Sequence, residues 1–107
     1  MAESYGDKEF YLNSSNKVLD AKEIFRGTVD QAVIYPREVI KSALEKNATK
    51  LIFAHNHPSG NPKPSEHDIE ITKRLKNSCD TVEIEILDHL IVGTGEYYSF
   101  REHGLVG

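Results

Sequence analysis

Two histidines and an aspartate lie close enough in the sequence to hold one metal ion. His55 and His57 are separated by one residue, and Asp68 follows after ten more. Imidazole nitrogens and carboxylate oxygens are common zinc ligands, and in catalytic sites three protein ligands leave the fourth tetrahedral position for water. The three residues are therefore predicted to form a catalytic zinc site, with Zn2+ as the cofactor.

A short strand is expected to present both histidines. Residues 50–54 form an apolar run of the kind found in buried strands, and the histidines follow directly. Side chains two apart on a strand project from the same face, so the rings of His55 and His57 can reach one ion. One glycine and three prolines between residues 58 and 64 then predict a sharp turn.

A helix is expected to bring the aspartate back toward the histidines. Ile71 and Leu75 recur at helical spacing, which places Asp68 in the first turn of that helix. Ser65 and Asp68 also fit a capping box, in which the serine hydroxyl closes the helix start and the helix dipole favours the acid. Capping and metal binding are compatible if the carboxylate turns toward the ion.

The pattern His55-x-His57-x7-Ser65-x2-Asp68 resembles the metal-binding motif of the JAMM (JAB1/MPN) metalloprotease superfamily. A longer set of residues is similar to the RadC family in particular, from about Tyr11 to the C-terminus. Its segments are Gly27-Thr28, Pro36-Arg37-Glu38, residues 54–62, Pro64-Ser65, Asp68, Leu87-Asp88-His89, Ser99-Phe100 and Gly104-Leu105.

This resemblance implies a single JAB1/MPN-like domain over residues 1–107, with zinc bound by His55, His57 and Asp68. It also implies hydrolysis of an amide or isopeptide bond in a peptide or protein substrate. Ser65 matches the superfamily serine that assists the attacking water or supports the oxyanion, a role suited to a hydroxyl. The name of the RadC family suggests DNA repair, for which these residues supply no physical argument.

The resemblance further implies a glutamate that acts as general base on an N-terminal strand. An ungapped comparison places Tyr5 at that position. Glu9 is the preferred candidate because it directly precedes the apolar run of residues 10–12, and Glu3 is the alternative. If neither carboxylate reaches the site, the chain is a metal-binding interaction module without hydrolytic activity. An N-terminus that has been trimmed or altered is an equal explanation.

Composition favours one small intracellular domain. The 107 residues can enclose one core, and the single cysteine, Cys79, is interpreted as a packing residue near a helix end in a reducing compartment. No stretch is long and apolar enough for a membrane span and no secretion signal is visible, so the cytoplasm is the expected location. The net charge of −4 disfavours a nucleic acid partner and makes a DNA-directed nuclease the weakest hypothesis. A zinc deaminase is disfavoured because its Cys-x-x-Cys is missing.

The rest of the chain predicts an α/β fold, a mixed sheet with flanking helices. Residues 10–12 and 17–19 are expected to form a hairpin, with 24–25 and 28–34 extending the sheet. Pro36 is expected to open a helix that ends near Asn47. Two further elements complete the prediction: a one-sided strand over residues 82–86 and a closing hairpin of residues 90–92 and 97–100.

The remaining histidines and a basic cluster are not predicted to bind the metal ion. His67 neighbours Asp68 on a helix and should point about 100° away from it, toward solvent. His89 either orients a metal ligand or forms a structural pair with Asp88 or nearby backbone. His103 is expected to be exposed. The cluster Lys73, Arg74 and Lys76 is interpreted as a solvated helix face.

Overall fold

The computed structural model describes residues 7–24, 34–57 and 59–106. They form a five-stranded sheet in the order β2-β1-β3-β4-β5. The elements are β1 (Asp7–Leu12), β2 (Val18–Ile24), α1 (Pro36–Glu45), β3 (Lys50–Asn56), α2 (Glu66–Asp80), β4 (Glu85–Val92) and β5 (Tyr97–Ser99). The sheet is mixed because β3 and β4 run parallel while the other pairs are antiparallel. The predicted α/β fold with a mixed sheet is confirmed.

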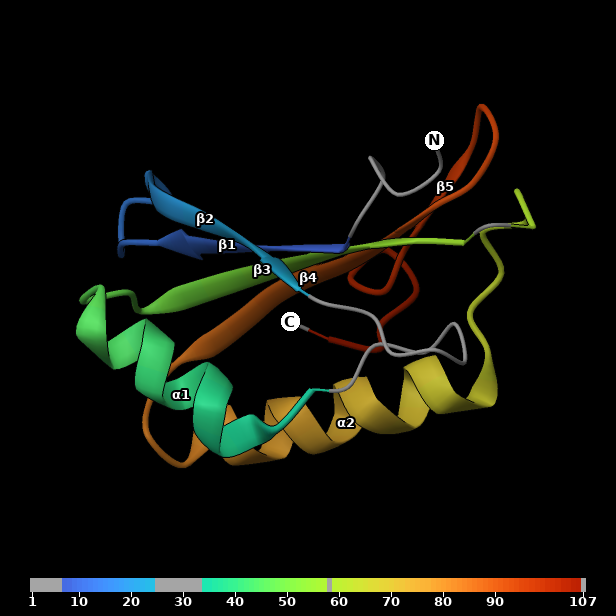
Figure 1. Cartoon of the computed structure of the whole chain (residues 1–107). Coiled ribbons are helices and arrows are strands. Elements are labelled where there is room, and N and C mark those ends of the chain that lie inside the picture. The colour runs from blue at the N-terminus through green and yellow to red at the C-terminus, as the bar shows by residue number, and fades with distance from the viewer. Residues whose placement is uncertain (1–6, 25–33, 58, 107) are drawn as a thin grey trace.

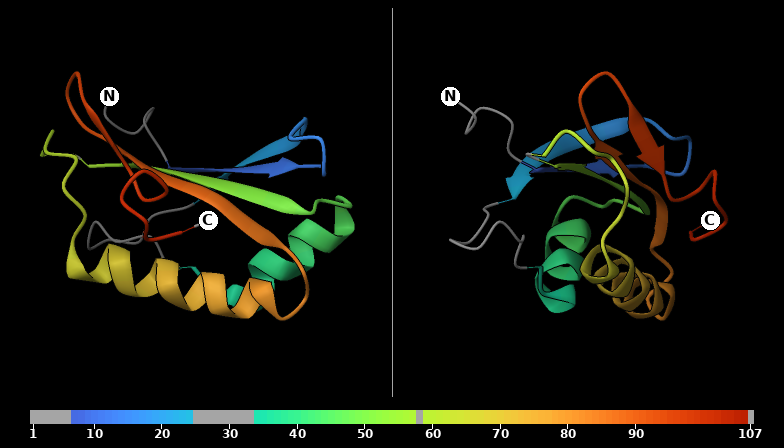
Figure 2. Two further views of the ribbon diagram at one scale, coloured as in Figure 1. Left: turned by 180° about the vertical axis from the view of Figure 1, so that it is seen from behind. Right: turned by 90° about the vertical axis from the view of Figure 1, so that its right-hand side faces the viewer.

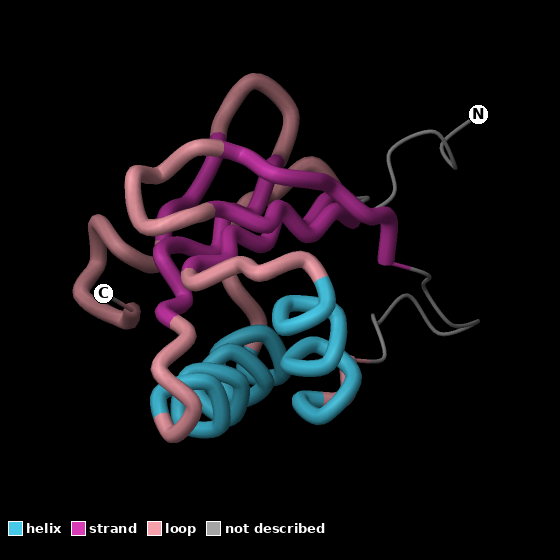
Figure 3. Tube along the Cα trace, turned by 90° about the vertical axis from the view of Figure 1, so that its left-hand side faces the viewer, coloured by secondary structure: helices cyan, strands magenta, loops and turns pink. Residues whose placement is uncertain are grey.

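Both helices lie on one face of the sheet (Figure 1). Two further views show the same two layers, and in the described part of the chain no helix lies on the opposite face (Figure 2). Seen from another side, the helices again lie together beneath the strands (Figure 3). Parallel neighbours need a crossover connection, and α2 supplies it between β3 and β4. The start of α2 therefore lies at the end of the sheet where β3 stops, and the helix runs back to the end where β4 begins.

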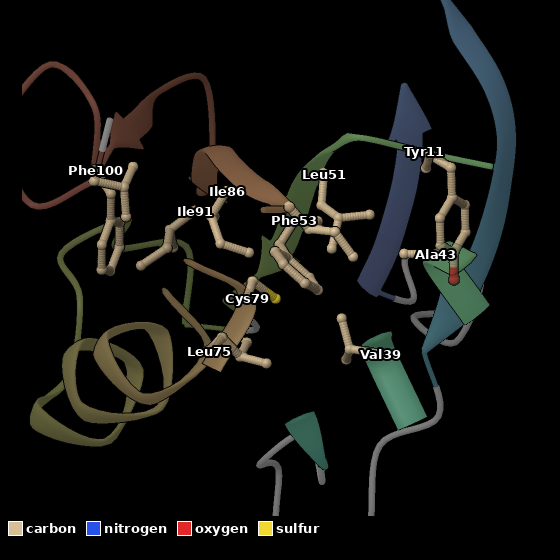
Figure 4. Packing of buried hydrophobic residues seen from close by; sticks show 13 residues of the cluster. Tyr11, Val39, Ala43, Leu51, Phe53, Leu75, Cys79, Ile86, Ile91 and Phe100 are labelled. Carbon is tan, nitrogen blue, oxygen red and sulfur yellow. The ribbon is translucent and has the colours of Figure 1, made fainter. Parts of the chain in front are cut away.

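The core lies between the sheet and the helices (Figure 4). Alternate residues of the central strands point toward the helices, among them Tyr11, Leu51 and Phe53, and all three are buried. Cys79, one residue before the end of α2, is fully buried in the same cluster. Burial, with smaller effects of Glu9 and Asp80, raises the pKa of its thiol to about 11. Its predicted packing role is confirmed.

Most predicted elements are found, and the strand expected over residues 82–86 differs in extent. Pro36 opens α1 as expected, and Asn47, just beyond the helix, has a φ of 57°. The strand expected over residues 82–86 is wrong at its start, because Val82 and Glu83 form a turn and β4 begins at Glu85. The cause is the end of α2, where the N–H of Val82 donates to the carbonyl of Cys79 (3.1 Å) and Glu83 adopts a φ of 61°.

The strand expected at 28–34 falls mainly outside the described residues, which omit 25–33. Within the described residues, Ile24 closes β2 and Ile34 belongs to no strand. None of the helices in the described part of the chain is long and apolar enough to cross a membrane.

Candidate metal centre

The structure brings the three predicted ligands together at the end of β3. His55 lies in β3, His57 follows its last residue, and Asp68 is in the first turn of α2. Nδ1 of His55 lies 3.1 Å from Oδ1 of Asp68, and Nε2 of His57 lies 3.0 Å from Oδ2 of the same carboxylate. One ligand atom from each residue can be chosen so that all three lie within 4.8 Å of one another. This geometry confirms the predicted convergence of the three side chains.

Backbone contacts fix the ring of His57. The backbone N–H of His57 donates to the carbonyl of Val92 (3.1 Å), which ties the chain after β3 to the end of β4. Its Nδ1 lies 2.9 Å from the carbonyl oxygen of Asn61. A carbonyl only accepts, so Nδ1 carries the proton and Nε2 keeps its lone pair toward Asp68. A metal ligand needs this tautomer, and a carbonyl is a common partner for the other nitrogen.

Asp68 completes the capping box anticipated from the sequence. Its N–H donates to Oγ of Ser65 (3.0 Å), and its Oδ2 accepts from the N–H of Ser65 (2.8 Å). Burial by itself would raise the pKa of the Asp68 carboxyl, but hydrogen bonds from His55 and Ser65 outweigh burial and hold this pKa well below its usual range. The carboxylate is therefore ionised and points at both histidines, so capping and ligation use the same side chain.

The residues present fit a divalent metal ion. Ligand atoms on one tetrahedral zinc lie about 3.3 Å apart, given bonds of about 2.0–2.1 Å, and the two histidine–carboxylate distances are close to this. These distances use Nδ1 of His55; the other ring nitrogen, Nε2, is buried, lies 3.9 Å from Oδ2 of Asp7 and, within the described residues, makes no hydrogen bond. One carboxylate and two imidazoles can coordinate several divalent metal ions.

A fourth side chain at the site, Asp7, was missed by the sequence reasoning. The antiparallel register pairs Lys8 with Ala54, so Asp7 at the start of β1 comes beside His55. Its Oδ1 accepts from the N–H of Asn56 (2.9 Å), and its Oδ2 lies 3.9 Å from Nε2 of His55. Asp7 is only 2% exposed and lines a small cavity together with His55 and Asp68.

Glu9, the base preferred from the sequence, lies elsewhere on the same face of β1. It pairs with Phe53 rather than with the histidine. Burial raises its pKa, opposed by Tyr11, Lys22 and Lys46. Glu9 therefore belongs to a polar group beneath α1, and it does not line the cavity beside the ligands. Glu3 lies outside the described residues.

His89 packs directly behind the site. Its ring stacks on His55, with centroids 5.9 Å apart, and on Phe100 at 4.5 Å. Nδ1 of His89 is 2.6 Å from the hydroxyl oxygen of Thr72, which joins β4 to α2. Burial lowers the pKa of His89 to about 4, so the ring is neutral. The backbone N–H of His89 donates to Oδ1 of Asp88 (2.7 Å), so the predicted structural pair is present, whereas the orienting of a metal ligand stays a prediction.

Three other expectations are tested by burial. The prediction that His67 points to solvent is wrong: the residue is half-buried and lines the cavity beside Asp7. The reason is that Asp7 and Ile34, which lie far from His67 in the sequence, line the same cavity and cover this side of the first turn of α2. His103 is exposed as expected, although it stacks on Tyr98. Lys73 and Arg74 are exposed, as a solvated face requires, and Lys76 is half-buried.

Comparison with known proteins finds a matching domain family and several similar proteins. The profile of the RadC-like JAB domain matches residues 8–105. A UPF0758 protein of Vibrio cholerae is 52% identical over 94 residues, covering 88% of this chain and 59% of the relative. UPF0758 proteins of Marinobacter nauticus and Streptococcus agalactiae are 50% and 48% identical, covering 90% and 91% of this chain but 43% and 46% of those proteins. The chain thus spans about half the length of these relatives.

Proposed function

The chain belongs to the RadC-like JAB domain family, and from that premise we propose that it is a zinc-dependent hydrolase of an amide or isopeptide bond. The observation that carries the proposal is the convergence of His55, His57 and Asp68 beside a second carboxylate, Asp7. The two histidines and Asp68 can bind a metal ion, and Asp7 can accept and release a proton.

The three ligands leave one place for water in a tetrahedral site, as in catalytic zinc centres. When bound, zinc supplies a Lewis acid that polarises a carbonyl and lowers the pKa of water toward about 7. Because histidine and carboxylate ligands also suit iron or manganese, the choice of zinc is part of the proposal.

Asp7 is our candidate for the proton acceptor. Hydrolysis forms a bond from water oxygen to the carbonyl carbon, breaks the carbon–nitrogen bond and moves a proton from water to the departing nitrogen. Oδ2 of Asp7 would take this proton and deliver it to the amine. We prefer Asp7 to Glu9 because its Oδ2 lies 3.9 Å from a ligand ring, whereas Glu9 pairs with Phe53.

Ser65 is proposed to assist the attack of water on the carbonyl. Its Oγ accepts from the N–H of Asp68, so its own O–H proton remains free to donate. A donated hydrogen bond stabilises the negative charge that develops on the carbonyl oxygen during attack. The Ser65 residue is exposed, which allows a substrate to reach it.

We propose a peptide or protein as the substrate. The net charge of −4 gives no general attraction for nucleic acid, and amide chemistry matches the site. The chain covers about half of its relatives, so partners and substrates of a longer protein are part of this proposal.

The test measures metal content and cleavage on the same preparations. Protein purified without added metal should contain about one zinc per chain by elemental analysis, and His57→Ala should contain none. His103→Ala, an exposed histidine away from the site, serves as the matched control and should keep its zinc. The parent should cleave members of a library of peptide and isopeptide conjugates, whereas His57→Ala should not.

The outcomes separate the hypotheses. Absence of zinc in the parent, or unchanged zinc in His57→Ala, contradicts the assigned site. Stoichiometric zinc without cleavage of any amide or isopeptide favours the alternative, a metal-binding interaction module. That alternative gains its support from the absence of a glutamate at the aligned N-terminal position.

A further inference from the structure

The turn between β4 and β5 is in contact with the loop that follows His57. The N–H of Thr94 donates to the carbonyl of Gly60 (2.9 Å), and the N–H of His57 donates to the carbonyl of Val92 (3.1 Å). The turn itself is closed by a hydrogen bond from Gly93 N–H to the carbonyl of Glu96 (2.9 Å). Two segments more than 30 residues apart in sequence are thus held together beside a metal ligand.

Glycine allows this close approach. A Cβ atom at Gly93 would lie 2.3 Å from the carbonyl oxygen of Gly60 and 2.9 Å from Cδ of Pro62. The φ of Gly93 is not in the left-handed range, so its need for glycine arises from the neighbouring backbone alone. Gly60 has a φ of 86°, and a Cβ there would meet Oγ1 of Thr94 at 2.6 Å.

The contact bears directly on His57. Asn61 lies between Gly60 and Pro62, and its carbonyl is the group that fixes Nδ1 of His57. Any side chain that pushes residues 60–62 away from the turn also moves this acceptor. The ring of His57 would then lose the partner that holds its tautomer and its direction.

We propose that the β4–β5 turn positions the metal centre, with Gly93 and Thr94 as positioning residues that act on His57 through the loop of residues 59–62. The proposal rests on the metal site assigned above. On this proposal, substitutions at Gly93 and Thr94 weaken metal binding even when the sheet remains folded.

The first experiment compares Gly93→Ala with Gly95→Ala in the whole chain. Gly95 lies in the same turn at a φ of 71°, and a Cβ there would meet no atom within 4 Å. Alanine at Gly95 strains the turn, whereas alanine at Gly93 pushes on the loop. Affinity for Zn2+ is measured by competition with a chromophoric chelator, and the coordination geometry by the visible spectrum of the Co2+ form. Gly93→Ala should weaken zinc binding about 10- to 100-fold and alter the Co2+ spectrum, and Gly95→Ala should do neither.

A second pair of variants, at Thr94, tests the hydrogen bond to Gly60 and leaves Gly93 unchanged. Thr94→Pro deletes the donor to Gly60, because proline has no backbone N–H, and it places a ring carbon against the Gly60 carbonyl in place of that hydrogen. Thr94→Ala keeps the backbone N–H and is the matched control. Weaker zinc binding is expected for Thr94→Pro alone. This pair decides the question if Gly93→Ala does not fold, as judged by circular dichroism.

The results also distinguish this proposal from the proposed function. If the parent binds zinc and folded Gly93→Ala and Thr94→Pro bind it equally well, the positioning role is wrong and the metal site stands. Equal weakening by Gly95→Ala and Thr94→Ala would likewise overturn it, since any damage to the turn would then suffice. A parent that binds neither Zn2+ nor Co2+ overturns both proposals.

Discussion

Two carboxylates on one strand, Asp7 and Glu9, are almost equally buried but have different surroundings. They lie two residues apart on the same face of β1, with 2% and 3% of their surfaces exposed. Asp7 lies beside His55, at the end of the sheet where the ligands gather. Glu9 lies toward α1, where Tyr11, Lys22 and Lys46 act on its charge.

The difference shows that burial alone does not identify a functional acid. Buried carboxylates are costly unless they are paired or hydrogen-bonded, and both residues meet this need with different partners. The chemistry of the neighbours decides what each can do. A carboxylate against imidazoles can serve a metal centre, whereas one beside a phenol and two lysines is part of a structural polar group.

Replacing each acid by its amide gives the largest expected contrast. Asp7→Asn should lower kcat by about 10²- to 10⁴-fold, the usual contribution of general acid–base catalysis, with zinc content unchanged. Glu9→Gln should stay close to the parent. The measurement is the initial rate of cleavage of whichever amide substrate the library identifies. The opposite ranking would return the base to Glu9, as predicted from the sequence.

A core substitution tests whether packing near the start of β3 affects metal binding at the end of the same strand. Leu51→Ala removes a fully buried side chain from β3 and should lower the free energy of unfolding by about 2–5 kcal/mol in urea titrations. Zinc affinity of the folded protein should remain within about twofold. Val92→Ala, at an exposed position, is the control and should change stability by less than about 0.5 kcal/mol. A large loss of zinc affinity in Leu51→Ala would show that the two ends are coupled.

Acidification should destabilise the metal-free protein through His89. The unfolded imidazole takes up a proton as pH falls below 6.5, whereas the folded one resists until about pH 4 because it is buried. Stability is thus lost as pH falls through this window, by on the order of 3 kcal/mol. Urea titrations with a chelator present, at several pH values, measure the slope. His89→Phe keeps a ring on Phe100 and should have a shallower slope; an unchanged slope would assign it to other groups.

Glu9 should give the smallest effect, with the opposite pH dependence. Because burial raises its pKa, its contribution to stability is complete at low pH and is lost as pH rises through the folded pKa. Glu9→Gln should therefore gain stability over the parent at pH 8 relative to pH 5, because glutamine has no charge to bury. Thermal melts at the two pH values provide the comparison. A variant that is equally destabilised at both would mean that the carboxylate is held by its lysine and tyrosine neighbours as an ion.

The ligand set could be predicted from the sequence because its determinants are local. An apolar strand ending in His-x-His, a proline-rich turn and a helix start at Ser65 all lie within 20 residues. Alternation along a strand and periodicity along a helix were enough to place His55, His57 and Asp68. The mixed sheet followed from the same patterns.

The acid of β1 could not be predicted in the same way. Whether Asp7 or Glu9 faces His55 depends on the register of β1 against β3, which are separated by some 40 residues and are joined only in the folded sheet. A shift of the pairing by two residues would place Glu9 beside His55 and move Asp7 beyond it. His67 was misplaced for a related reason, since its burial depends on what packs over the first turn of α2.

The capping box at the start of α2 has a practical consequence. Oδ2 of Asp68 accepts from the Ser65 N–H and also faces His57, so a cation at the site would draw on the same lone pairs that hold this amide. The exchange rate of the Ser65 amide proton with deuterium should therefore respond to metal loading, and one backbone resonance would report occupancy without any substrate.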